Sequence, residues 1–134
     1  MATAPTFAAT PEAWAVTVPA TLDTSNTAPT NTATLVTAGA SGSKIEEIRI
    51  VQLASTTGSG IVNIFLYDGS TYHLFETVSI PAVTLSTTVS NPSDQIFIGN
   101  YSNLVIQSGW SIRVTVTVAT FQSAFKVLAF GGDF

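Results

Sequence analysis

The segment from Trp110 to Val118 alternates without a break between apolar and polar residues. Successive side chains of a β-strand point to opposite faces of a sheet, so this period of two predicts a strand with one buried face. The buried face is predicted to hold Trp110, Ile112, Val114, Val116 and Val118, and the outward face Ser111, Arg113, Thr115 and Thr117. Because the outward face carries hydroxyls and a single charge, the strand is suited to building structure more than to catalysis.

Strand signals of this kind recur at short intervals, separated by turn residues such as Gly39–Gly42 and Gly58–Gly60. In one long segment the alternation slips at Glu46-Glu47, as a β-bulge would make it. With no amphipathic helix in the chain, the pattern predicts an all-β fold, a two-sheet antiparallel sandwich that is jelly-roll-like. The predicted strands are Ala13–Val18, Ala33–Thr37, Ser43–Ala54, Gly60–Asp68, Thr71–Ile80, Gln95–Gly99, Asn103–Gln107, Trp110–Thr120 and Ala124–Phe130.

The first 34 residues differ from the rest in composition. They are rich in Thr, Ala and Asn, and four prolines are spread through them, at Pro5, Pro11, Pro19 and Pro29. Proline fixes φ and removes a ladder donor, which favours extended chain over a central strand. We therefore predict an extended N-terminal arm over residues 1–34 and a β-sandwich domain over residues 35–134. Trp14 is predicted to anchor the arm.

The strands on either side of Asp68-Gly69 are predicted to form a hairpin, because this dipeptide favours a tight turn. One face should carry Val62, Ile64 and Leu66 with His73, Phe75 and Thr77, and the other Ile61, Phe65 and Tyr67 with Tyr72, Leu74 and Val78. Both faces are largely apolar, so we expect one in the core and the other under the arm or a neighbouring subunit. The predicted interaction residues are Phe7, Trp14, Val16, Val18, Val62, Ile64, Leu66 and Phe75.

Charged residues make up only 9% of the chain, against about 25% in typical domains. The four cations, Lys44, Arg49, Arg113 and Lys126, are too few and too scattered to follow a phosphate backbone, so no nucleic-acid partner is predicted. No stretch of about 20 apolar residues exists, so no membrane span is predicted. The remaining surface is neutral and hydroxyl-rich, which indicates a subunit of a large assembly or, alternatively, a free domain with a Thr-rich surface.

Residues with catalytic chemistry are scarce. His73 is the single histidine, and nothing in its surroundings marks out a nucleophile or an orienting acid. The neighbouring Glu46 and Glu47 point to opposite faces of a strand, which does not suit a glycosidase pair. Glu76 has several possible partners, namely Arg49, Arg113, Lys126 or none at a sheet edge. With no cysteine and no calcium-loop motif, we predict no catalytic, cofactor or metal site and no enzymatic activity.

The body of the chain from Leu35 to Phe134 resembles small β-sandwich proteins encoded among phage structural genes, including capsid decoration (cement) proteins. An ordered set of local patterns carries the resemblance: Val36–Ile48 (VTAGASGSKIEEI), Ile64–Gly69 (IFLYDG), Leu74–Glu76 (LFE), Ser108–Val114 (SGWSIRV) and Phe130–Phe134 (FGGDF). These patterns consist mostly of turn and core residues, and none is a catalytic signature. The arm is less typical of these proteins and is not matched to them residue by residue.

The resemblance implies a structural virion protein on the outer capsid surface, where it bridges and strengthens capsid subunits. Its partners would be the major capsid protein and copies of itself, as a homo-oligomer. We expect the arm to bridge by β-addition, so that deletion of residues 1–30 would abolish capsid binding and leave the fold intact. Two alternatives remain open: another virion component, such as a head fibre, tail or baseplate subunit, or a carbohydrate- or receptor-binding β-sandwich module. The aromatic residues that could serve such a module are Trp14, Tyr72, Tyr101 and Trp110.

Overall fold

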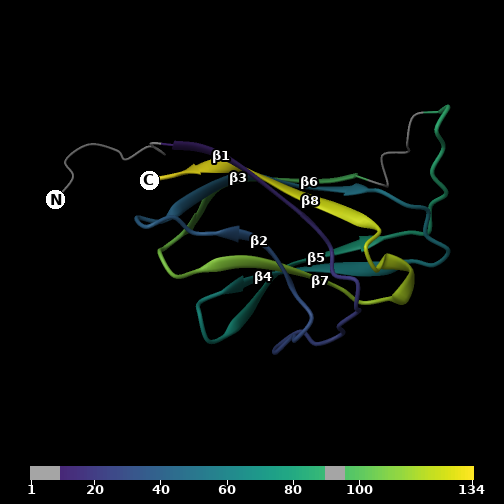
Figure 1. The fold of residues 1–134 in the computed structure, drawn as a ribbon, viewed down its shortest axis with the longest axis horizontal. Coiled ribbons are helices and arrows are strands. Elements are labelled where there is room, and N and C mark those ends of the chain that lie inside the picture. The colour runs from purple at the N-terminus through teal and green to yellow at the C-terminus, as the bar shows by residue number, and fades with distance from the viewer. Residues whose placement is uncertain (1–9, 90–95) are drawn as a thin grey trace.

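The chain forms two stacked four-stranded antiparallel sheets in the computed structural model, which describes residues 10–89 and 96–134 (Figure 1). Sheet A has the strand order β1-β8-β3-β6, and sheet B has the order β2-β7-β4-β5. No helix among the described residues has the length and apolarity needed to cross a membrane. The elements are β1 (Thr10–Thr17), β2 (Ala33–Thr37), β3 (Ser43–Gln52), β4 (Gly60–Tyr67), β5 (Tyr72–Ile80), β6 (Ile96–Ile106), β7 (Ser111–Val116), the 3-10 turn η2 (Ala119–Phe121) and β8 (Phe125–Asp133).

The strands pair in a nested order around the central hairpin. β4 pairs with β5, β3 with β6, β2 with β7 and β1 with β8, all antiparallel. The chain therefore doubles back on itself and forms two sheets. The β3–β8 pair completes sheet A, and the β4–β7 pair completes sheet B. This nesting is that of the jelly roll, so the predicted fold class is confirmed.

The core lies between the inner faces of the two sheets, as strand alternation predicts. The central strand β7 buries Ile112, Val114 and Val116 completely. One end of the core is filled by Phe121 and Phe125, whose rings pack edge to face with centroids 4.7 Å apart. The other strands contribute Ile45, Ile48, Ile50, Val62, Ile64, Val127 and Ala129. Fully buried branched side chains hold such a core at close packing.

The structure has a β-bulge in β3 at the predicted Glu46-Glu47 slip, and opposite it β6 runs on as one strand where the sequence analysis predicts two. The register of β3 shifts between Ile45 and Glu47 against both of its neighbours, which confirms the predicted bulge. Opposite this shift, three residues of β6 (101–103) lie between partners of Ile45 and Glu47. The predicted strands Gln95–Gly99 and Asn103–Gln107 are therefore one strand, β6, because the extra residues are absorbed without ending the ladder.

Much of the predicted arm belongs to the sandwich. β1 pairs with β8 along its whole length, from Thr10↔Asp133 to Thr17↔Lys126, and Val18 is buried in the core. Residues 19–32 then cross the outer face of sheet B, where the Asp23 backbone N–H donates to Val116 O and Asn63 Nδ2 donates to Asn26 Oδ1. The prolines do not prevent this, because an edge strand and a connection both tolerate them. Residues 10–17 of the predicted arm are therefore a strand of sheet A, and residues 19–32 contact sheet B.

The β1–β2 connection also explains why an outward side chain is buried. Thr115 faces away from the core, as predicted, yet it is fully buried beside its ladder partner Asn63. Among the described residues, its hydroxyl oxygen has no hydrogen-bond partner. Burial of a polar group without a partner costs free energy.

Thr115→Val is therefore expected to raise the free energy of unfolding by about 1 kcal/mol. The matched control is Thr77→Val in the same ladder row, because Thr77 is exposed; its effect should stay within about 0.5 kcal/mol. Urea unfolding of the three proteins measures both values. A lower free energy for Thr115→Val would mean that the hydroxyl is satisfied, for example by water.

Candidate functional site

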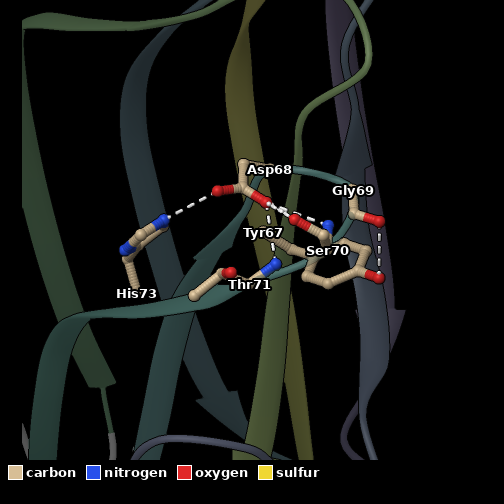
Figure 2. A network of polar contacts seen from close by, with 6 residues as sticks. All are labelled: Tyr67, Asp68, Gly69, Ser70, Thr71 and His73. Carbon is tan, nitrogen blue, oxygen red and sulfur yellow. Dashed lines mark hydrogen bonds and ion pairs between the residues drawn. The ribbon is translucent and has the colours of Figure 1, made fainter.

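The turn between β4 and β5 is organised by one carboxylate (Figure 2). Asp68 Oδ1 accepts hydrogen bonds from the backbone N–H groups of Ser70 and Thr71, at 2.9 and 2.7 Å, and from the Ser70 hydroxyl at 3.1 Å. Gly69 has φ of 100°, which side-chain-bearing residues rarely adopt. The predicted Asp-Gly hairpin is thus a four-residue loop closed by its own aspartate.

His73 contacts the second oxygen of the Asp68 carboxylate. Its Nε2 lies 3.0 Å from Asp68 Oδ2, and its ring stacks on Trp110, with centroids 6.0 Å apart. The Ser70 hydroxyl bonds to Asp68 and not to the imidazole, so this cluster orders a turn and sets no nucleophile against a base. The described residues contain no group of three or more His, Cys, Asp or Glu placed to hold a metal.

Acid should loosen this turn. The N–H donors of Thr71 and Ser70, together with His73, hold the pKa of Asp68 well below its usual range. A carboxyl whose pKa is depressed by folding stabilises the protein above its unfolded pKa, near 3.9, and this stabilisation is lost as pH falls toward the folded pKa.

Asp68→Ala should therefore lower the unfolding midpoint at neutral pH, and the difference from the unsubstituted protein should shrink as pH falls below about 4. Asp68→Asn is the matched control, because an amide oxygen can still accept from the backbone of the turn. Thermal unfolding from pH 2 to 7 tests both variants. A constant difference across this range would contradict the assigned charge effect.

The outer face of sheet B carries an aromatic cluster with a stacked arginine. The Arg113 guanidinium carbon lies 4.4 Å from the ring centroid of Tyr67 and 5.9 Å from that of Tyr72. Arg113 Nε donates to Ser111 Oγ at 3.1 Å, and Nη1 donates to the Tyr72 hydroxyl at 3.3 Å. Phe65 contacts Tyr72 edge to face beside them. A cation held over aromatic rings and by two hydroxyls is fixed in position.

Glu76 finds its partner on the opposite sheet. The Tyr101 hydroxyl on β6 donates to Glu76 Oε2 on β5 at 2.5 Å, and the Tyr101 ring packs against Phe75. Burial raises the pKa of Tyr101 well above its usual value, and the Glu76 carboxylate adds to the effect. This contact joins the edge strands of the two sheets, so none of the cations proposed as partners for Glu76 pairs with it.

The predicted interaction residues lie within the sandwich where the structure describes them. Phe7 is outside the described residues. Val18, Val62 and Ile64 are buried in the core, and Trp14, Val16, Leu66 and Phe75 pack against it partly buried. A fully buried side chain offers no contact area to a partner. A second difference concerns the hairpin faces: Val78 joins the core beside Val62 and not the Phe65 face, because a bulge shifts the register between Ile64 and Phe65.

An exposed apolar surface lies instead on the outer face of sheet A, and the sequence analysis did not single it out. Phe130 on β8 is 38% exposed, and Ile98 and Val105 on β6 are 47% and 54% exposed. Between β8 and β6 lies β3, whose Arg49 and Glu47 form an ion pair at 3.3 Å. We call these five residues the sheet A patch. Its members alternate with core residues along their strands, and this alternation is the one sequence signal that places them on an outer face.

A hollow of about 360 Å³ opens beside Trp110. It is lined by Val105, Ile106 and Gln107 at the end of β6 together with Trp110 itself. Trp110 is partly buried against the core and against His73, so only part of its ring faces this hollow.

No protein family, curated protein or solved structure matches the chain.

Proposed function

We propose that this protein is a structural virion component that decorates a phage capsid and bridges its subunits. The sheet A patch carries the proposal, because three large apolar side chains are exposed on one sheet face of a protein with few charges. Apolar patches of this kind mark protein–protein contacts. The jelly roll supports a structural virion role, since viral capsid domains use this fold. The ordered motifs from Val36 to Phe134 supply the resemblance to decoration proteins.

Decoration also fits the edges of the sheets. β1 carries Pro11 and Glu12, β2 is five residues long, and β5 and β6 are bulged. Prolines, charges, short strands and bulges all discourage the addition of another strand. Contact with capsid subunits is therefore assigned to the sheet faces and no longer to β-addition by residues 10–34.

Co-sedimentation of the purified protein with expanded, empty shells of its cognate capsid protein tests the proposal. Saturable binding at a fixed ratio is expected, and the double variant Ile98→Ser, Phe130→Ser should weaken it by about tenfold or more. Leu53→Ser is the matched control, because Leu53 is just as exposed but lies outside the sheet A patch. An absence of binding to intact shells would contradict decoration and favour a tail or fibre subunit.

The hollow beside Trp110 favours one second candidate, a carbohydrate-binding module. An aromatic ring and the Gln107 amide could hold the apolar face and a hydroxyl of one sugar. Loss of glycan binding in Trp110→Ala, with shell binding absent in the unsubstituted protein, would establish this function instead.

A further inference from the structure

Arg113 is the single charged side chain on the outer face of the sheet B strands. In the ladder it lies between Thr34 on β2 and Phe65 on β4, and the next residue across the sheet is Leu74 on β5. The other outward side chains of these strands are hydroxyl, amide or apolar. Asp23 lies on the connection that crosses this face, and its carboxylate accepts hydrogen bonds from the backbone N–H groups of Ser25, Thr30 and Asn31. Within the described part of the chain, Arg113 forms no ion pair, whereas Arg49 pairs with Glu47 and Lys44 with Glu46.

The guanidinium is held in place and yet retains hydrogen-bonding capacity. Arginine has five N–H donors in a planar fork. Two donors of Arg113 have protein partners: Nε–H donates to Ser111 Oγ, and Nη1–H donates to the Tyr72 hydroxyl. The remaining donors, including both at Nη2, have no protein acceptor among the described residues. Because stacking on Tyr67 already restricts the side chain, a ligand would lose little further rotamer freedom on binding.

The ligand that fits such a group is a carboxylate. A planar carboxylate can accept two parallel N–H bonds from a guanidinium, which strengthens the bond and fixes its direction. Charge also favours an external acid, since no acidic residue that the structure describes forms an ion pair with Arg113. Glu76, on β5 of the same sheet, lies opposite the core residue Ile64 and accepts a hydrogen bond from Tyr101 on the other sheet.

The surroundings favour a protein as the source of that carboxylate. Tyr and Arg are the residue types enriched at energetically dominant positions of protein interfaces. Leu74 adds an exposed apolar side chain beside them. The hollow described above lies elsewhere, at Trp110, so Arg113 sits on a sheet face suited to a protein surface more than to an enclosed small molecule.

We propose that Arg113, with Tyr67, Tyr72 and Leu74, forms a docking surface for an Asp or Glu side chain of a partner protein. It is a second contact, on the sheet opposite the sheet A patch. The identity of the partner as a capsid protein rests on the proposed function, whereas the carboxylate chemistry does not.

The chemistry is tested by NMR on the arginine Nε–Hε signals of the full chain, titrated with sodium acetate at constant ionic strength. Arg113 should shift saturably, with a dissociation constant about tenfold or more below that of Arg49, which already has a carboxylate partner. Equal responses of the two arginines would overturn the proposal. Sodium glucuronate is the second probe, and if it binds Arg113 more than about tenfold tighter than acetate, the ligand is an acidic sugar and the protein partner is ruled out.

The partner is tested with shells. Arg113→Lys retains the charge but loses the planar fork, so it should weaken shell binding by about tenfold. The control is Lys44→Arg, which also retains the charge and lies outside the sheet A patch, and it should leave shell binding within about twofold. Thermal unfolding of both variants checks that they are folded. Shell binding that is unchanged in Arg113→Lys would overturn the docking surface while decoration still stands. If the unsubstituted protein binds no shells, decoration fails and the acetate titration alone decides on the site.

Discussion

A chain shortened to residues 31–134 is expected not to fold, whereas one that starts at Thr10 should unfold cooperatively like the full protein. The deletion removes β1, which pairs with β8 along eight residues, and it uncovers the core beneath Val18. It also strips the cover from Asn63 and Thr115. Each fully buried aliphatic side chain contributes about 1.5–3 kcal/mol, and the total stability of a domain is only about 5–15 kcal/mol. The structure therefore predicts that this deletion destroys the fold, whereas the sequence pattern alone predicts that the fold stays intact.

Circular dichroism and urea unfolding of the two truncated chains measure the difference. The chain from Thr10 is the matched control, because it retains all eight strands. A cooperative transition in residues 31–134 would contradict the structural role of β1, and would restore the view that the first 30 residues act only as an arm.

Gly131→Ala is expected to be the most damaging single substitution that adds only one methyl group. A Cβ at this position would lie 1.9 Å from the backbone carbonyl oxygen of Lys44 and 3.0 Å from the Cα of Ile45. Both atoms belong to the β3 backbone next to its bulge, so no side chain can turn aside to make room. The β3–β8 ladder must separate locally, at a cost of about 3 kcal/mol, the upper end of typical overpacking.

Gly58→Ala is the matched control for this substitution. A Cβ at Gly58 would meet no atom within 4 Å, so the free energy of unfolding should change by less than about 0.5 kcal/mol. Urea unfolding compares the two variants with the unsubstituted protein. Equal, small effects would mean that β8 does not approach β3 as closely as described.

Sequence patterns predict this fold because a period of two records which side of a strand meets the core. Ile112, Val114 and Val116 face inward as expected, the Asp68-Gly69 turn closes its hairpin, and the slip at Glu46-Glu47 is a bulge. Each of these signals lies within a few residues of the structure that it produces.

Features that depend on distant segments could not be predicted in this way. The burial of Thr115 depends on residues 19–32, and the partner of Glu76 is Tyr101 on the other sheet. A bulge moves Val78 to the core face, because one extra residue exchanges the faces of everything beyond it. Which strands lie side by side is also decided by distant segments. Alternation alone therefore cannot identify the sheet A patch, nor can it show that Arg113 forms no ion pair with a described carboxylate.

The pairing of β1 with β8 also governs when the protein can fold. Thr10 lies opposite Asp133, so sheet A cannot be completed until β8 has left the ribosome. The nested pairs make most contacts non-local, which places refolding in the range of milliseconds to seconds. During synthesis both edges of β3 stay unpaired until its neighbours β6 and β8, which are made after it, have emerged. The nascent chain is therefore most exposed to aggregation before β8 emerges, and stopped-flow refolding of the released protein would time the closing step.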